Sequence, residues 1–368
     1  MTDNNVKKEG SGFFGWAIWF WNVFCKQWVW ETFCKNWVWQ TFCKKWFWED
    51  FCVNNVYGKF EKWKGWLYLS PAIVLLLIFT VWPIFNTVRM SLLEGYSTMA
   101  EANPFHTGFE FGFGNFTRVL KYQNFLRCLK NTVLLTVLTV PISTFIALLI
   151  AVCLNSIKFL NRFLQTVFFL PYVTNSIAIG MVFYAMFNMI IGGQARPDSV
   201  GIVNNVIEVF AGKGSYINWI NAGSEYWANL FVMTVYIVWN ALPFKILILL
   251  GGLQSVNKQY YEAAKVDGTS RARTFWRITV PLLSPMIAYV VITGFIGGFK
   301  EYSSIVGIFG DFMGPKGNAY SMDTMVGFIY RAIANQEGTA SAAALILFGI
   351  IFAVTLVNLY VSKKKTHY

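Results

Sequence analysis

Charged residues are scarce in this 368-residue chain. Asp, Glu, Lys and Arg make up only 13% of it, about half the share found in soluble proteins, whereas 56% of its residues are hydrophobic and 18% are aromatic. The mean hydropathy is +0.47. A soluble fold could not bury that much apolar surface, so lipid must be part of the solvent. The composition therefore excludes a soluble protein and predicts an integral membrane protein.

Motifs for nucleotide or metal chemistry are also lacking. The chain has two histidines, His106 and His367, and both lie outside the long apolar stretches. The nearest approach to the phosphate-binding sequence G-x-x-x-x-G-K-[ST], at residues 207–214, lacks the first glycine and the final Ser or Thr. We therefore expect no catalytic residue, no metal ligand and no cofactor in this chain, so that any driving energy must come from a partner subunit.

Six apolar stretches are long enough to cross a membrane as a helix, which takes about 20 residues. They are Trp66–Val88, Thr132–Leu154, Leu164–Ile191, Tyr226–Leu250, Ile278–Phe299 and Ala342–Val361. Five of them contain proline, which helix bundles tolerate where neighbouring helices satisfy the freed backbone groups. We predict an all-α integral membrane protein with six transmembrane helices.

Charge is nearly absent from these six stretches. Lys245 is the only charged residue in them, and it lies near the end of its stretch, where its side chain can extend to the membrane surface. Carriers driven by protons or sodium usually keep titratable groups at membrane depth, because the coupling ion must bind there. We therefore expect the chain not to couple transport to an ion by itself.

Basic residues are denser in segments 155–163, 251–277 and 362–368 than in the loops on the other side of the six stretches. Because cytoplasmic loops carry an excess of Lys and Arg, this bias places both termini in the cytoplasm. The four basic residues between 118 and 130 depart from the bias, and we predict that an interfacial helix carries them. Its apolar side would be Phe116, Val119, Leu120, Leu126 and Leu129.

Residues 19–54 contain four copies of a nine-residue unit, WFWNVFCKQ, WVWETFCKN, WVWQTFCKK and WFWEDFCVN. Nine residues make about two and a half helical turns, so the repeat gives no single apolar face. The cysteine spacing is wider than the C-x₂₋₄-C pairs of zinc sites, and in the cytoplasm these thiols would stay reduced, so we expect no metal and no disulfide. Two interpretations stay open: the tryptophans lie at the inner membrane–water boundary, or the repeat docks a partner.

The segment 255–285 has the sequence SVNKQYYEAAKVDGTSRARTFWRITVPLLSP. Ser255 can cap a short helix, which ends where Gly268 is free to form a left-handed turn. Ser270 can cap a second helix, which carries three arginines and ends before Pro281. This pattern predicts a helix–turn–helix projection that fits a groove on another protein.

This segment resembles a family motif. Glu262-Ala263-Ala264, three residues, Gly268, nine residues, Ile278, two residues and Pro281 are similar to the E-A-A-x₃-G-x₉-I-x-x-P loop of binding-protein-dependent ABC importer permeases. Other pieces resemble the carbohydrate branch of that family, the maltose and glycerol-3-phosphate permease type: GNFTRVL, LKNTVLLT, FFLPYV, VWNALPFKILILLGGLQSV and FIYRAI.

The resemblance covers most of residues 110–360 and departs from the family pattern in three places. Thr269 follows Gly268, where alanine is commoner. The outer segment 300–325 keeps only a loose likeness to the glycine- and proline-rich loop of the family. The first 58 residues have no counterpart in the pattern.

The resemblance implies a type I ABC importer permease fold for residues 59–368, preceded by a cytoplasmic or interfacial extension at 1–58. It makes residues 253–280 a coupling loop, which docks in a cleft of a cytoplasmic ATPase and transmits its movement to the membrane helices. Glu262 would make a polar contact with the ATPase and Ala263 and Ala264 would allow close approach. The turn would be formed by Asp267 and Gly268.

The implied complex contains a second homologous permease, two cytoplasmic ABC ATPase subunits that bind ATP and Mg, and an extracellular solute-binding protein. The chain would then be a multi-pass protein of the plasma (cytoplasmic) membrane, with both termini cytoplasmic, and would bind no nucleic acid. Its function would be the import of sugars or oligosaccharides. The alternatives are another polar solute such as glycerol phosphate or a polyamine, a stand-alone channel or secondary carrier, and a membrane scaffold built around the repeats.

Tyrosines and asparagines inside the predicted spans could bind sugar, because sugar sites combine aromatic faces with hydroxyl and amide partners. The same side chains are equally explained by helix packing, so the sequence assigns no substrate-binding residue. The candidates are Tyr172, Asn175, Tyr184, Asn188, Tyr236 and Asn240.

Overall fold

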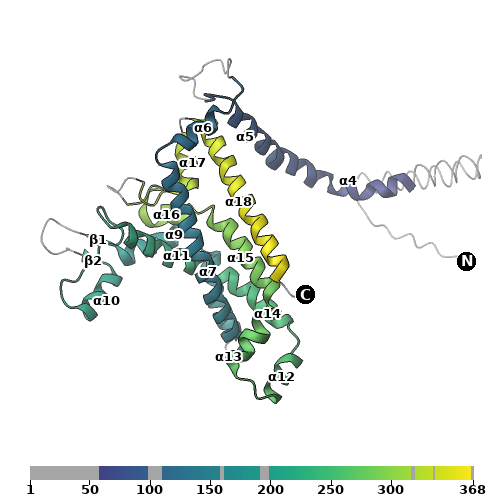
Figure 1. Cartoon of the computed structure of the whole chain (residues 1–368), viewed down its shortest axis with the longest axis vertical. Coiled ribbons are helices and arrows are strands. Elements are labelled where there is room, and N and C mark those ends of the chain that lie inside the picture. The colour runs from purple at the N-terminus through teal and green to yellow at the C-terminus, as the bar shows by residue number, and fades with distance from the viewer. Residues whose placement is uncertain are drawn as a thin grey trace, which may run out of the picture. The chain divides into compact units, whose positions relative to one another are not determined.

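The computed structural model describes residues 58–97, 110–157, 161–190, 199–315, 320–334 and 336–365. Most of these residues are helical (Figure 1). The four nine-residue repeats lie outside the described residues. The chain divides into two compact units, Met1–Ile84 and Phe85–Tyr368.

In the first unit, helix α4 (Gly58–Leu76) continues through the π-helical turn η3 (Leu77–Val81) into α5 (Trp82–Leu92). The apolar part, Tyr68–Leu92, is long enough to cross a membrane and overlaps the first predicted span. Pro71 lies inside α4 without ending it.

The second unit contains the rest of α5 and all later elements. In chain order they are α6 (Gly114–Lys121), α7 (Phe125–Ser156), α8 (Asn161–Val173), α9 (Ser176–Phe187), β1 (Met189–Ile190), β2 (Ser199–Val200), α10 (Ile202–Ala211), α11 (Tyr226–Ser255), α12 (Gln259–Val266), α13 (Arg271–Thr274), η4 (Phe275–Thr279), α14 (Val280–Leu282), α15 (Ser284–Gly298), α16 (Ser303–Phe309), α17 (Met325–Ile333) and α18 (Glu337–Lys365). The two strands pair antiparallel.

Among the described residues, four of the six predicted spans are membrane-length helices and the other two are bent pairs of shorter helices. Besides Tyr68–Leu92, three single helices are long and apolar enough to cross: α7, α11 and α18. Two further spans are bent pairs: α8 with α9, at 98°, and the helical segment Arg271–Leu282 with α15, at 70°. The predicted stretches Leu164–Ile191 and Ile278–Phe299 are therefore each broken rather than straight.

Local backbone chemistry explains both bends. Asn175 is extended (φ −65°, ψ 123°), and its Oδ1 accepts hydrogen bonds from the backbone N of Ile177 (2.8 Å) and Ala178 (3.4 Å), so it starts α9 as a new helix. At the other bend, Leu283 leaves the ideal helical ψ (φ −86°, ψ −1°), and a proline occupies the first turn of α15, where no donor is needed.

The predicted end of the second short helix before Pro281 is wrong. Helices α13 and α14 join through the π-helical turn η4 into one segment from Arg271 to Leu282. The last bond of η4 runs from the backbone N of Val280 to the carbonyl of Phe275, so the turn is closed before the proline and requires no donor from it.

The predicted interfacial helix around residues 116–130 is also wrong. Tyr122 is extended and separates α6 from α7. Val119 and Phe125 are buried in an apolar cluster with residues of α17 and α18, while Leu120 and Leu126 are exposed. Of the predicted apolar side, Phe116, Val119 and Leu129 pack in this cluster of the same chain, whereas Leu120 and Leu126 do not.

Helix α7 packs along α11 at the centre of the second unit. Helix α16 packs against α9, and the two backbones meet at Gly180 and Gly307. A β-carbon built on Gly180 would lie 2.6 Å from the Gly307 backbone, so this crossing requires glycine. The arrangement holds the loop between α11 and α15 at one end of the unit, opposite α6 (Figure 1).

Candidate functional site

The coupling loop, residues 253–280, begins where α11 ends. The predicted helix cap at Ser255 is wrong, because Ser255 is the last residue of α11 and its Oγ donates to the Gly252 carbonyl (2.7 Å). The side chain that starts the next helix is Asn257, whose Oδ1 accepts from the backbone N of Gln259 (3.0 Å). Helix α12 therefore starts three residues later than predicted.

The end of α12 confirms the predicted left-handed turn. Gly268 has φ +63°, which favours glycine. Its backbone N donates to the Lys265 carbonyl (3.1 Å), and the backbone N of Thr269 donates to the Ala264 carbonyl (2.9 Å). These two bonds form a Schellman motif, which satisfies the last carbonyls of the helix and fixes the direction of the following chain.

The second arm of the loop begins as predicted at Ser270, whose Oγ accepts from the backbone N of Arg273 (3.4 Å). The two arms are tied together, because the Tyr261 hydroxyl lies 3.4 Å from Oγ1 of Thr279. The coupling loop is thus a closed helix–turn–helix, continuous with α11 on one side and with the Arg271–Leu282 segment on the other.

Most of the predicted contact residues lie on the surface of this projection. Glu262, Ala263, Asp267 and Gly268 are exposed. Ala264 is turned inward and only 6% exposed, so its small side chain serves packing within the loop. An apolar residue that the prediction omitted, Val266, is 88% exposed at the end of α12.

A second arrangement lies across three membrane helices. Four aromatic rings follow one another: Phe169 and Tyr172 of α8 (centroids 5.3 Å apart), Phe244 of α11 (6.0 Å from Tyr172, interplanar angle 20°) and Tyr289 of α15 (6.5 Å from Phe244). Tyr172 and Tyr289 are 54% and 48% exposed, so both leave ring surface uncovered in this chain. We call these four residues the aromatic strip.

Sequence reasoning found only Tyr172 of the strip, since no spacing rule links residues on three separate helices. Three other candidates hold the fold together. Tyr236 is buried and its hydroxyl donates to the Ser176 carbonyl (2.6 Å), Asn175 caps α9, and Asn188 accepts from Nδ2 of Asn221 (2.6 Å).

Lys245 does not extend to the membrane surface as predicted. It is only 4% exposed, and its ammonium donates to Oγ of Ser143 (2.7 Å), Oγ1 of Thr144 (2.9 Å) and the Val140 carbonyl (3.2 Å), all on α7. The position of the lysine near the end of an apolar stretch could not reveal that a neighbouring helix offers three oxygens at that depth.

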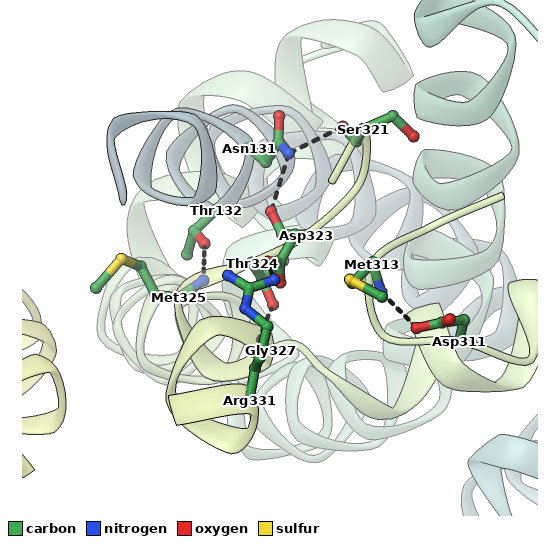
Figure 2. Close-up of polar contacts among 10 residues, drawn as sticks. All are labelled: Asn131, Thr132, Asp311, Met313, Ser321, Asp323, Thr324, Met325, Gly327 and Arg331. Carbon is green, nitrogen blue, oxygen red and sulfur yellow. Dashed lines mark hydrogen bonds and ion pairs between the residues drawn. The ribbon is translucent and has the colours of Figure 1, made fainter. Parts of the chain in front are cut away.

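A buried polar cluster fixes the segment between α15 and α18 to α7 (Figure 2). Nδ2 of Asn131 donates to the carbonyls of Ser321 (3.0 Å) and Asp323 (2.9 Å), and the carboxylate of Asp323 pairs with Arg331 at 2.6 Å. Oγ1 of Thr132 accepts from the backbone N of Met325 (3.0 Å). Burial raises the pKa of Asp323, and the Arg331 guanidinium opposes that shift. No motif or periodicity in the sequence indicates this cluster, which rigidifies the segment.

Among the described residues, no group of three or more His, Cys, Asp or Glu side chains gathers as a metal site would require. The site consists of an exposed projection joined to α11 and to the segment leading to α15, and of a strip of aromatic rings on α8, α11 and α15.

Comparison with known proteins gives a consistent result. Residues 139–367 match the model of the family described as binding-protein-dependent transport system inner membrane component. The lactose transport system permease protein of Rhizobium radiobacter is 29% identical over 295 residues, covering 80% of this chain and 91% of the relative. The arabinooligosaccharides transport system permease protein of Halalkalibacterium halodurans is 30% identical over 306 residues, covering 81% and 87%.

Among solved structures, the chain is similar to a bacterial ABC transporter involved in the import of the acidic polysaccharide alginate. The TM-score is 0.66 at 20% sequence identity, over 83% of this chain and 97% of that one. At this identity, the likeness shows the shared fold, which is the type I importer permease architecture expected from the sequence.

Proposed function

Because the chain belongs to the family of binding-protein-dependent transport system inner membrane components, we propose that it is the permease subunit of an ATP-driven ABC importer for sugars or oligosaccharides. As a transport subunit it supplies the membrane path and no catalysis. The lactose and arabinooligosaccharide transport roles of its relatives support a saccharide as the solute.

The proposed complex pairs this chain with a second, homologous permease in the lipid bilayer. Two ABC ATPase subunits bind ATP and Mg on the cytoplasmic side, and a solute-binding protein delivers solute from outside. The chain lies in the plasma membrane with the coupling loop and both termini in the cytoplasm, in agreement with the distribution of its basic residues. Residues 59–368 form the permease domain, and residues 1–58 are an extension to it.

The observation that carries this proposal is the coupling loop. Helix α12 is fastened at its end by the Schellman motif at Gly268, and the Tyr261–Thr279 contact holds it to the second arm. A force applied by the ATPase to Ala263 therefore moves the whole projection. Because the projection is continuous with α11 and with the segment leading to α15, that movement reaches the membrane helices.

The aromatic strip is the proposed contact for the sugar. Aromatic rings stack on the apolar faces of sugar rings, and tyrosine adds a hydroxyl that binds sugar hydroxyls. The exposed rings of Tyr172 and Tyr289 lie on α8 and α15, so a solute on the strip touches α15, which is joined to the coupling loop.

Cross-linking of the complete complex tests the coupling role. In a cysteine-free background, Ala263→Cys should cross-link to the ATPase subunit through a short thiol reagent. Tyr330→Cys, an exposed position on α17 outside the coupling loop, is the matched control and should not. Efficient ATPase cross-linking at Tyr330→Cys with none at Ala263→Cys would contradict the proposed docking.

Uptake into proteoliposomes tests the solute. Lactose, an arabino-oligosaccharide, glycerol 3-phosphate and putrescine are offered to the complete complex, and the cognate class should accelerate ATP hydrolysis. Tyr289→Ala should reduce uptake strongly while Tyr289→Phe should retain most of it, because the phenyl ring keeps the stacking face. Solute flux through the purified chain without ATPase subunits or ATP would favour the channel alternative instead.

A further inference from the structure

Lys245 places a positive charge inside the bundle, where it is only 4% exposed. Its three hydrogen bonds go to two hydroxyls and one carbonyl, which are neutral oxygens, and no carboxylate of the described residues bonds to it. The helices α7, α8, α9, α11 and α15 contain no Asp or Glu at all. The charge is therefore uncompensated over the membrane-spanning part of these helices.

Such a charge is expensive to bury, and in membrane proteins it marks a functional position. Three oxygens of α7 bind this ammonium, and two of them are the hydroxyls of Ser143 and Thr144, just beyond Pro141. A methionine at this position would fill a similar volume without the cost of dehydrating the ammonium. The arrangement therefore needs a reason other than stability.

The ammonium lies beside the same helices that carry the aromatic strip. Phe244 of the strip precedes Lys245 on α11, and α15 carries both Tyr289 and Gly294. A β-carbon built on Gly294 would stand 3.3 Å from Nζ of Lys245, so the backbone of α15 passes close to the ammonium at this glycine. A solute on the strip would therefore lie about one helix diameter, about 10 Å, from this charge, in surroundings where water screens charge weakly.

We propose that Lys245 gives the solute path a fixed positive potential, which selects sugars bearing a carboxylate or phosphate over neutral sugars and excludes cationic solutes. This inference rests on the proposed function and narrows its solute class. Lys245 acts through its field, because its three donors are already used by α7. It is a specificity-determining residue without direct contact to the solute.

The potential at the strip can be measured without knowing the solute. In the complete complex with its cysteines replaced, Tyr289→Cys or Tyr172→Cys introduces one thiol on the strip, and its reaction rates with the anionic reagent MTSES and the cationic reagent MTSET are compared. Lys245→Met should lower the MTSES-to-MTSET rate ratio at least about tenfold, the effect of a unit charge acting over about 10 Å through protein. Lys245→Arg should preserve the ratio.

Two controls separate this effect from misfolding and from general charge. Lys245→Met should fold, because the Oγ of Ser143 and the Oγ1 of Thr144 already donate to carbonyls of their own helix, Thr139 (2.5 Å) and Val140 (2.7 Å), and stay paired. Lys213→Met removes an exposed lysine after α10, outside the coupling loop and the strip, and should leave the ratio unchanged. The basal ATP hydrolysis of each variant is measured in parallel.

Protection of the thiol identifies the anion. Glucuronate, glycerol 3-phosphate and neutral lactose are added at equal concentration before MTSES, and each anion should slow the reaction of the thiol more than lactose does. Stronger protection by glucuronate indicates a carboxylate solute, and stronger protection by glycerol 3-phosphate indicates a phosphate solute. Equal protection by lactose overturns the inference. So does an unchanged reagent ratio in Lys245→Met, or failure of both reagents to react at both strip positions. Retained uptake of a neutral sugar in those cases leaves the proposed function standing.

Discussion

The left-handed turn at Gly268 allows a sharp test of the coupling loop. A β-carbon built on this glycine meets no atom of the described residues within 4 Å, so a methyl group causes no clash with them. The penalty of a substitution comes from the backbone, whose φ of +63° costs a non-glycine residue about 1–2 kcal/mol. Asparagine tolerates this region better than alanine, and a β-branched residue tolerates it worst.

The expected order of impairment is therefore Gly268→Asn, then Gly268→Ala, then Gly268→Val. A penalty of about 1–2 kcal/mol corresponds to about a 5- to 30-fold loss of the correctly formed loop relative to wild type. Gly268→Trp should be more severe, because its ring would fill the open space that the ATPase occupies in the proposed complex. Membrane insertion should be unaffected in all four variants.

The assay is solute-stimulated ATP hydrolysis of the complex in proteoliposomes, with ATPase co-purification as a second readout and membrane insertion as the control. If Gly268→Ala is no worse than Gly268→Asn, backbone strain does not set the outcome. If Gly268→Trp retains uptake and ATPase co-purification, the loop is not the docking site and the central argument fails.

Three further predictions concern the fold around these sites. Arg331→Met leaves the buried carboxylate of Asp323 unpaired and should destabilise the protein by about 3–5 kcal/mol, with a smaller loss when Asp323→Asn is added, as measured by thermal unfolding in detergent. Burial raises the pKa of Asp323, and the loss of Arg331 raises it further, so the folded state of Arg331→Met binds a proton more readily than the unfolded chain. The stability of this variant should therefore recover on acidification and fall as pH rises. The opposite trend would contradict the reasoning. Asn175→Ala removes the cap of α9 and should cost about 1 kcal/mol in the same assay, whereas a neutral result would mean that packing alone sets the bend. Deletion of residues 1–58 should preserve transport, at reduced expression, as measured by uptake into proteoliposomes; loss of transport would favour the scaffold alternative.

The positions of the spans could be predicted because hydropathy and length determine them almost alone. The turn of the coupling loop could be predicted because only glycine adopts its conformation readily at Gly268. The two bends could not be predicted. One depends on the Asn175 side chain, which accepts hydrogen bonds from two backbone N–H groups, and the other depends on a change of ψ at Leu283. Both effects are local and leave no periodic signal.

The other wrong predictions share one cause: the sequence of a segment does not show which group its side chains will contact in the folded protein. The apolar side of residues 116–130 is the same whether lipid or another helix covers it; the structure packs Val119 with residues of α17 and α18 and leaves Leu120 and Leu126 exposed. Lys245 has the same place in the sequence whether it reaches water or the hydroxyls of Ser143 and Thr144. The aromatic strip likewise exists only once three distant helices are brought together.

The 98° corner between α8 and α9 has a consequence for what can surround it. A helix that breaks at Asn175 leaves carbonyls of the preceding turn without their usual donors, and Oγ1 of Thr174 supplies one to Pro171 (2.8 Å). Hydrocarbon offers no hydrogen bonds, so acyl chains cannot line such a corner. Val173, Thr174 and Asn175 are exposed in this chain, and in the membrane that side must therefore meet water or another polypeptide.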